Sequence, residues 1–234
     1  MSRKTSQQLL IKKFIKSEHI VIEAINYFSA MSHSDLFSSS RGFNKNSRNT
    51  MFREIMSVQS RLAGKYKDNI KCGSYPYIPL DFSTFAILVS IARTAIGKYT
   101  KASFLDVGCG IGDKVLLASS VFDFFYGLEY VDAYIKEGEK LFSKFGRYNT
   151  IATKTGSRFE SPFIKGDALE FSGYGDYQVI YFYCPFSDCK KEEEFEDKLL
   201  LDMKRGTIVI PVGGQSIKDS KKLKFISLDV YIKI

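Results

Sequence analysis

The sequence predicts an α/β protein in which a doubly wound, mostly parallel sheet follows an N-terminal helical extension. Three observations predict this fold class. From residue 103 onward, short apolar runs alternate with amphipathic segments, as strands and helices do in a parallel α/β sheet. One apolar run leads directly into a Gly-x-Gly-x-Gly turn at 108–112. The chain has 234 residues, 44% of them hydrophobic, which is enough for one large or two small domains. We assign residues 1–80 to the extension and 81–234 to the core.

The part of the chain before residue 103 is predicted to be largely helical, because its apolar side chains recur at the spacing of one helix face. One or two helices are expected over 6–30, another over 51–66, and a third over 81–98 with Asp81 or Ser83 as its N-cap. Residues 31–50 are rich in Ser and Asn and predict a loop. Glycine and two prolines break the regular structure over 72–79.

After residue 103, strands and helices are expected to alternate. The predicted strands cover residues 104–107, 122–129, 163–170, 177–184, 207–212 and 223–234, and the helices between them cover 114–120, 132–144 and 192–203. The last strand suits an antiparallel position at the edge of the sheet or inside it. An exposed loop is expected over 150–162, an insertion that precedes the third predicted strand.

Charge and residue usage narrow the functional classes. The four cysteines form no Cys-x-x-Cys pair, and both histidines, His19 and His33, lie in the N-terminal third, so we expect no metal site and no Ser/His/Asp or Cys/His triad.

The net charge of +8 is unevenly placed, because residues 1–102 hold 16 Lys and Arg against 6 Asp and Glu. This excess fits a nucleic-acid contact or a solvated helical face. No apolar run is long enough to span a membrane, and the N-terminus lacks the apolar block of a signal peptide.

The strongest chemical signal is the run Phe-Leu-Asp-Val-Gly-Cys-Gly-Ile-Gly over 104–112. A strand ends there in Asp106 and turns sharply through three glycines into a helix. Glycines allow a ligand to approach the backbone closely and allow the tight reversal, which indicates a nucleotide-binding turn. Glu129 ends the next strand 19 residues after Gly110, where a carboxylate can accept hydrogen bonds from both ribose hydroxyls. The spacing departs from the Gly-x-Gly-x-x-Gly of dinucleotide-binding dehydrogenases.

Together with Glu129 and the Gly-Asp-Ala run at 166–168, this turn resembles the class I, seven-strand S-adenosylmethionine-dependent methyltransferases over about residues 100–215. The resemblance implies a Rossmann-like core that binds S-adenosyl-L-methionine, releases S-adenosyl-L-homocysteine and needs no metal. It also implies roles for single residues. Asp106 and the turn residues Gly108, Cys109, Gly110 and Gly112 would hold the methionine and ribose, Glu129 the ribose hydroxyls, Asp167 the adenine amino group and Ala168 the ring through its backbone, with Tyr130 against the adenine.

The tetrapeptide Tyr183-Cys184-Pro185-Phe186 ends the fourth predicted strand, at the edge where open parallel sheets bind ligands. Amino methylases of the family carry Asn/Asp-Pro-Pro-Tyr/Phe there, so Tyr183, Pro185 and Phe186 are the candidate catalytic residues, and Tyr183 is also a candidate donor contact. Because Tyr183 replaces the Asn or Asp, nucleobase amino methylation is disfavoured. Pro185 and Phe186 would form a wall beside an amine, which a hydroxyl of Tyr181 or Tyr183 would orient. Alternation between the two faces of a buried strand explains much of the same run.

Two further stretches resemble subfamilies. Residues 74–79 are similar to the loop before the core of lysine-directed seven-strand methyltransferases, which lies over the methionine end of the donor, and Tyr77 is its candidate contact. Residues 206–213 are similar to the fifth strand of protein isoaspartate methyltransferases, although β-propensity alone explains them.

We therefore expect a cytoplasmic S-adenosylmethionine-dependent methyltransferase without a membrane partner, acting on a protein side chain with a lysine-type amine. Methylation of RNA, suggested by the basic N-terminal third, and methylation of a small molecule are the alternatives within the enzyme class. A non-catalytic nucleic-acid-binding protein with the same fold is the alternative outside it.

Overall fold

The computed structural model describes residues 45–63, 82–97, 101–146, 149–153, 156–214 and 216–234. The predicted helices over 6–30, the predicted loop over 72–79 with Tyr77, and both histidines lie outside the described residues.

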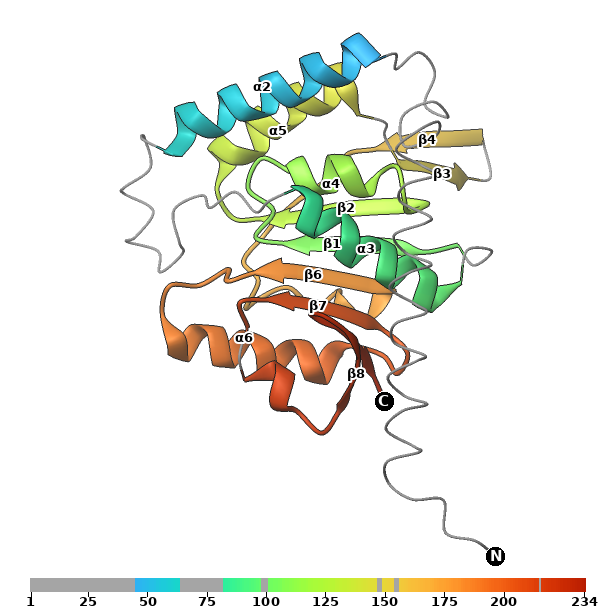
Figure 1. The fold of residues 1–234 in the computed structure, drawn as a ribbon, viewed down its shortest axis with the longest axis vertical. Coiled ribbons are helices and arrows are strands. Elements are labelled where there is room, and N and C mark those ends of the chain that lie inside the picture. Colours follow the sequence, from blue (N-terminus) through green and yellow to red (C-terminus); the bar gives the residue numbers. More distant parts are fainter. Residues whose placement is uncertain (1–44, 64–81, 98–100, 147–148, 154–155, 215) are drawn as a thin grey trace, which may run out of the picture.

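A seven-stranded sheet forms the centre of the molecule (Figure 1). Its strands are β1 (Ser103–Val107), β2 (Phe124–Glu129), β5 (Phe163–Lys165), β6 (Val179–Tyr183), β7 (Ile208–Val212), β8 (Leu223–Ser227) and β9 (Val230–Lys233). They lie side by side in the order β5-β2-β1-β6-β7-β9-β8. The strands from β5 to β7 are mutually parallel, whereas β9 is antiparallel to both of its neighbours. The predicted doubly wound, mostly parallel α/β sheet is confirmed.

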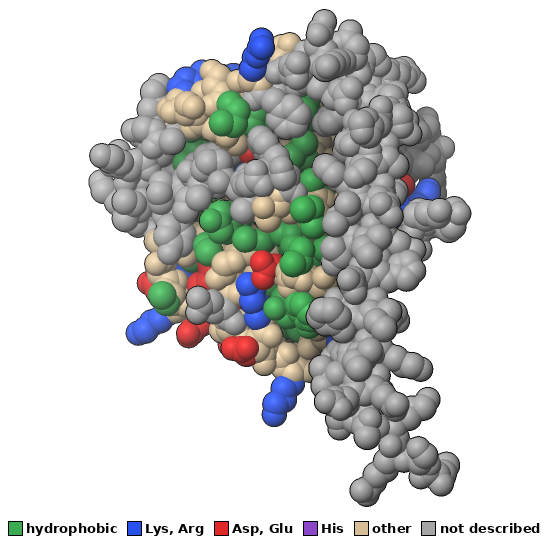
Figure 2. Space-filling view, in the orientation of Figure 1, with side chains coloured by type: hydrophobic (Ala, Val, Ile, Leu, Met, Phe, Trp, Pro, Cys, Tyr) green, Lys and Arg blue, Asp and Glu red, His purple; other side chains and the backbone are tan. Residues whose placement is uncertain are grey.

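Helices cover both faces of this sheet. The described helices are α2 (Lys45–Ala63), α3 (Phe82–Ile96), α4 (Asp113–Ala118), α5 (Asp132–Phe145) and α6 (Cys189–Asp202). The apolar side chains of α2 to α5 pack on one face, and those of α6 pack on the other. Figure 2 shows hydrophobic side chains in the middle of the displayed face and charged ones in its lower part, where Figure 1 places α6.

Strand β6 shows why the sequence builds two buried faces. Val179 and Tyr181 pack among the side chains on the α3 side, whereas Ile180 and Phe182 pack on the α6 side. Successive side chains of a strand point to opposite faces, so a strand covered on both sides must be apolar throughout. The alternation predicted for residues 181 to 183 is therefore observed. Tyr181 pairs with Asp106 of β1, so the two side chains lie on the same face of the sheet.

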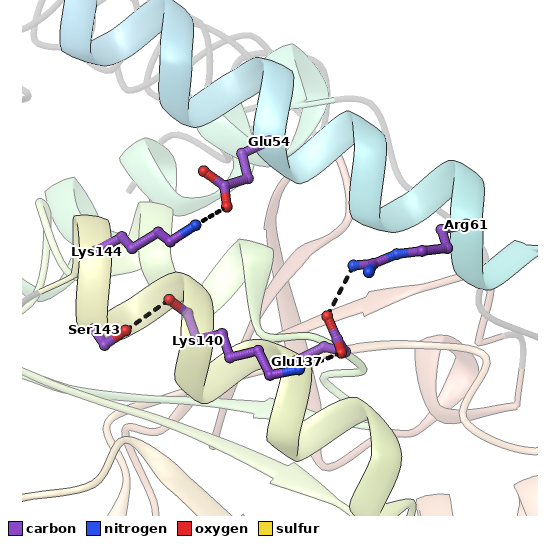
Figure 3. A network of polar contacts seen from close by, with 6 residues as sticks. All are labelled: Glu54, Arg61, Glu137, Lys140, Ser143 and Lys144. Atoms are coloured by element: carbon purple, nitrogen blue, oxygen red, sulfur yellow. Dashed lines mark hydrogen bonds and ion pairs between the residues drawn. The ribbon is translucent and has the colours of Figure 1, made fainter.

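Helix α2 is held on α5 by an apolar contact and by surface charges. Met51, Ile55, Val58 and Leu62 of α2 belong to the same buried cluster as Leu141 and Phe142 of α5. At the surface, Arg61 bonds Glu137 at 2.9 Å and Lys144 pairs with Glu54 (Figure 3). Exposed ion pairs contribute little free energy, so the buried face supplies most of the stabilisation of this contact.

The structure differs from the predicted loop over 150–162. Strands β3 (Asn149–Thr153) and β4 (Gly156–Glu160) pair antiparallel in a separate two-stranded sheet. The Asn149 side chain attaches this unit to β2, because its Nδ2 donates to Phe125 O at 2.8 Å and its Oδ1 accepts from Phe125 N at 3.1 Å. The loop prediction was wrong, because Thr and Ile in this segment favour paired strands over open loop.

The single terminal strand predicted over 223–234 is also wrong, since β8 and β9 form a hairpin in which Ser227 pairs with Val230. Leu228 takes a left-handed conformation in the turn, with φ of 48°. Hairpin turns of this kind usually show Gly or Asn, and neither occurs here. β9 is the strand inside the sheet and β8 is at its edge.

Helix boundaries shift by a few residues from the prediction. α2 begins at Lys45, inside the predicted 31–50 loop, and Ser83 lies inside α3 and so does not cap it. α6 begins at Cys189 because Asp188 is its N-cap and accepts a hydrogen bond from Lys190 N at 2.8 Å. In the described part of the chain, no helix is both long and apolar enough to cross a membrane.

Candidate functional site

A cavity of about 360 Å³ lies at the carboxyl ends of β1, β2 and β6. Its volume is within the range of small-molecule sites, roughly 300–1,000 Å³. Parallel strands direct their carboxyl ends to one edge, so the segments that follow β1, β2, β5 and β6 all meet there (Figure 1). The cavity is therefore built from segments that are far apart in the sequence.

The glycine turn follows β1 and forms one wall. Gly108, Gly110 and Gly112 have φ of 74°, 57° and 68°, a left-handed region that favours glycine. Space is also limited, because a Cβ on Gly112 would lie 2.6 Å from the Phe163 ring. Gly108 N donates to Leu128 O at 2.9 Å, which fixes the turn against the end of β2. Gly108 and Gly110 line the cavity, whereas Gly112 supports the turn from behind.

Glu129 ends β2, and its side chain connects the end of this strand to the glycine turn after β1. Its Oε2 accepts from Gly110 N at 2.8 Å and its Oε1 accepts from Val131 N at 2.7 Å. Burial raises the pKa of Glu129, and these N–H groups partly offset that rise. A carboxylate oxygen accepts more than one hydrogen bond, so Glu129 still has acceptor capacity toward the cavity.

Asp106, the acidic residue of β1, is buried and lines the same cavity. Burial raises the pKa of Asp106 well above its usual value. The positive charge of Lys114 lowers this pKa, whereas the negative charges of Asp113 and Glu129 raise it further. Several acidic groups thus meet around one lysine, an environment that favours a ligand carrying positive charge.

Tyr130, Asp167 and Ala168 lie on the cavity wall formed by the segments after β2 and β5. Tyr130 is 58% exposed, so a large part of its side chain is accessible to a ligand. Asp167 Oδ1 accepts from Leu169 N at 2.9 Å, which fixes the turn. Ala168 O accepts from the Tyr174 hydroxyl at 2.7 Å.

The segment after β6 forms the opposite wall, with Tyr183, Cys184, Pro185 and Phe186. Cys184 has a φ of 42°, unusual for a residue with a side chain, and its Sγ lies where a side chain on Gly213 would be. Burial raises the pKa of the Cys184 thiol, so it stays protonated and is a poor nucleophile.

Phe186 is held from two sides. Its N–H donates to Glu192 Oε2 at 3.1 Å, and its ring centroid lies 5.9 Å from that of Phe195. Burial raises the pKa of Glu192 to about 7.

Most residues predicted from the sequence meet in this one cavity. Those that line it are Asp106, Gly108, Cys109, Gly110, Glu129, Tyr130, Asp167, Ala168, Tyr183, Pro185 and Phe186. Gly112 does not line it, and Tyr77 is outside the described residues. Sequence reasoning missed Lys114, Leu128, Val131, Tyr134 and Lys191. Lys114 could have been found from its place two residues after the last glycine of the turn, whereas Lys191 lies in a charged run typical of a solvated helix start.

The connectivity of the sheet decides the fold. Numbering only the strands of the main sheet in chain order gives 3-2-1-4-5-7-6, and the seventh strand is the antiparallel one inserted beside the fifth. The chain has the class I methyltransferase fold. The resemblance first indicated by the glycine turn is thus confirmed at the level of the fold.

Solved structures similar to this chain include methyltransferases. One is an S-adenosylmethionine-dependent methyltransferase from Clostridium acetobutylicum, with 12% identity, a TM-score of 0.45 and coverage of 66% of this chain and 56% of that chain. Another is an RNA methyltransferase from Salinibacter ruber in complex with S-adenosyl-L-homocysteine, with 15% identity, a TM-score of 0.42 and coverage of 67% and 91%. A putative caffeoyl-CoA O-methyltransferase from Staphylococcus aureus has 13% identity, a TM-score of 0.45 and coverage of 77% and 98%.

The chain spans about half the length of the Clostridium protein. Models of known protein families give no match, and neither do curated protein sequences. The strand order of the chain itself, rather than these distant similarities, identifies the methyltransferase fold. Among the described residues, no group of three or more His, Cys, Asp or Glu side chains is placed to hold a metal ion.

Proposed function

We propose that this protein is an S-adenosylmethionine-dependent methyltransferase whose acceptor is a protein side chain with a lysine-type amine. The observation that carries the proposal is the single cavity in which the glycine turn, two buried carboxylates and an aromatic strand end come together. Each of these features alone is common, and their convergence at one sheet edge is what favours a donor site.

The residues of the cavity fit the donor at both of its polar parts. Asp106 offers a buried carboxylate to an ammonium group, and Glu129 keeps acceptor capacity for vicinal hydroxyls beyond its bonds to Gly110 N and Val131 N. Tyr130 offers an accessible aromatic side chain, with Asp167 and Ala168 beside it for the edge of a purine.

S-adenosylmethionine, when bound, supplies a methyl group attached to a sulfonium. A nucleophile would attack this methyl group directly, with neutral S-adenosylhomocysteine as the leaving group. The protein then contributes chiefly position and exclusion of water. Burial raises the pKa of the Cys184 thiol, which disfavours the thiolate that a cysteine nucleophile needs. Pro185 and Phe186 form a rigid apolar wall at the strand end, and the Glu192 bond to Phe186 N fixes its backbone.

An amine acceptor is favoured by the chemistry of that wall. An aliphatic amine packs well on the face of Phe186, and its protonated form is attracted to an aromatic ring. The ammonium must release a proton before the neutral amine attacks the methyl group. Tyr183 brings a second ring and a hydroxyl to the same end of the cavity.

RNA is the second candidate acceptor, because Lys191 is on the cavity wall and residues 1–102 carry an excess of Lys and Arg. Phosphate contacts would make such binding strongly salt-dependent, whereas side-chain methylation would depend less on salt.

The test is transfer of a labelled methyl group from S-adenosylmethionine to separate protein and RNA pools. We expect label in protein, at residues that acid hydrolysis identifies as methyllysine, and loss of label with Glu129→Ala. Label in RNA alone would favour the second candidate. Donor binding without transfer to any pool, including metabolites, would contradict the catalytic proposal.

A further inference from the structure

Two acidic side chains of α6 connect this helix to the segments that follow β6 and β7. Glu192 Oε2 accepts from Phe186 N at 3.1 Å, in the segment after β6. Glu196 Oε2 accepts from Ile217 N at 2.8 Å and from the Ser216 hydroxyl, in the segment after β7. Residues four positions apart on a helix lie on one face, so the two carboxyl groups are neighbours.

The second oxygen of each carboxyl group, Oε1, is out of contact with solvent and has no hydrogen-bond partner among the described residues. Glu196 as a whole is only 2% exposed. A Cβ on Gly214 would lie 2.5 Å from Glu196 Oε1, so the glycine leaves room for this oxygen. Two neighbouring buried acceptors thus lack a donor, and an unsatisfied buried polar group is costly.

The charged surroundings supply no such donor. Lys218 is the cation in the segment after β7, and its Nζ bonds Asp229 Oδ1 at 2.7 Å. Cys184 faces the two carboxyl groups from the segment after β6, because the charges of both raise the pKa of its thiol beyond the effect of burial, while that of Lys218 lowers it. Burial, with the negative charge of Glu196, raises the pKa of Glu192 to about 7.

We propose that Glu192 and Glu196 share one proton and act as a positioning pair that holds the Phe186 wall of the cavity. The hydroxyl of one carboxyl group donates to the carboxylate of the other, so a single proton satisfies both Oε1 atoms and leaves one negative charge. The pair thereby joins the segment after β6 to the segment after β7. The inference rests on the proposed function for the part that Phe186 plays beside the acceptor, whereas the shared proton does not depend on methyl transfer.

Loss of this proton to solvent changes how the wall is held. The pair then carries two negative charges one helix turn apart, and the hydrogen bond between the carboxyl groups is gone. Like charges in a buried place repel strongly, so the carboxylate that bonds Phe186 N is no longer fixed. The acceptor side of the cavity should therefore be well positioned at low pH and less so as pH rises through about 7.

The test follows the amide signals of Phe186 and Ile217 in the full chain by nuclear magnetic resonance, from about pH 5.5 to about pH 9. Each of these N–H groups donates to one carboxyl group of the pair, so its chemical shift responds to ionisation there. Coupled groups titrate as a unit, and we expect both signals to move with one midpoint near pH 7. An Ile217 signal that stays constant while the Phe186 signal moves would overturn the shared proton.

Two variants separate the members of the pair. Glu192→Gln keeps an acceptor for Phe186 N and replaces the shared proton by an amide that does not titrate, so the Ile217 midpoint should disappear from this range. In Glu196→Gln, Glu192 gains an amide donor and loses its negative neighbour, so the Phe186 midpoint should fall by at least about one pH unit. Glu193→Gln, exposed on the same helix, is the matched control and should keep both midpoints.

Unchanged midpoints in either folded variant would also overturn the pair. The wild-type titration and Glu192→Gln decide the question if Glu196→Gln does not fold.

Labelled methyl transfer to the protein pool tests the positioning role. The ratio of the Glu192→Gln rate to the wild-type rate cancels the pH dependence of the acceptor amine itself. We expect this ratio to rise at least about threefold from pH 6 to pH 8.5, because only the wild type loses the pair. A constant ratio would overturn the positioning role. No transfer by the wild type would overturn the proposed function and the role at the acceptor, whereas the two amide midpoints decide the shared proton by themselves.

Discussion

At the scale of single residues, the backbone of the glycine turn and the charges around Asp106 govern the site. Gly112 combines a left-handed φ of 68° with close contact to Phe163, whereas Gly206 has a φ of 92° and open space around it. These two glycines therefore separate the cost of backbone strain from the cost of crowding.

Gly112→Ala should lower the free energy of unfolding by about 3 kcal/mol, because backbone strain and overpacking add. Gly206→Ala should cost only about 1 kcal/mol, since it meets strain alone. Urea denaturation of both variants measures the difference. Equal losses would show that the Phe163 ring yields to the added methyl group.

The affinity for S-adenosylmethionine should rise with pH over the range in which Asp106 loses its proton, which lies above the ordinary aspartate pKa of 3.8. Burial raises the pKa of Asp106, so at low pH the carboxyl is protonated and cannot pair with the ligand ammonium. Titration across this range measures the slope, and Asp106→Asn should bind weakly with a much flatter profile. Affinity that falls as pH rises would contradict the assigned role of Asp106.

At the scale of elements, α2 and α6 both pack on the core through buried apolar side chains, but only α6 also contributes to the cavity. The buried face of α2 packs on α5, while exposed ion pairs surround that contact (Figure 3). Helix α6 lines the cavity with Lys191, and its Glu192 carboxylate holds the backbone of Phe186.

Ile55→Ala should lower the free energy of unfolding by about 3 kcal/mol, because it leaves a cavity in the cluster that α2 shares with α5. Arg61→Ala, which removes the exposed bond to Glu137, should cost less than about 1 kcal/mol. Urea denaturation distinguishes the two. A larger loss for Arg61→Ala would mean that charges, rather than apolar packing, hold α2.

Glu192 should make stability depend on pH. Its pKa is raised to about 7 in the folded protein, above its ordinary 4.5, so the folded state holds the proton more tightly. The contribution of Glu192 to the free energy of unfolding is therefore largest at low pH, and it falls as pH rises from about 4.5 through about 7. Partial solvent exposure limits the effect to about 1 kcal/mol. Glu192→Gln should remove this part of the slope in urea denaturation at pH 5 and pH 8, and an unchanged slope would exclude Glu192 as its source.

At the scale of the whole molecule, the parallel sheet and most of the cavity could be predicted from the sequence. Buried strands must be apolar on both faces, and strand ends carry the polar ligand-binding residues, so Asp106 and Glu129 were visible in their runs. Segments whose sequence carries no clear strand or turn pattern were not predictable. The hairpin turn places Leu228 in a left-handed conformation without Gly or Asn, and Asn149 pairs a side chain with the backbone of β2, which no local pattern reveals.

Residues that act through long-range contacts were missed for the same reason. Lys114 and Gln59 are separated by 55 positions in the chain and converge on Asp113 only after folding. The Tyr181 hydroxyl was a candidate from the sequence, but only the folded structure shows that it is buried without a hydrogen-bond partner among the described residues.

The most direct test of the donor site is calorimetric titration of the protein with S-adenosylmethionine and S-adenosylhomocysteine, beside Glu129→Ala and the matched surface variant Glu193→Ala. We expect the protein to bind both ligands, and we expect Glu129→Ala to weaken this binding at least about tenfold, because the ribose hydroxyls lose a charged acceptor. Glu193→Ala, exposed on α6, should bind as the wild type does. Folded wild-type protein that binds neither ligand, or a folded Glu129→Ala variant with unchanged affinity, would contradict the assignment of this cavity to the methyl donor.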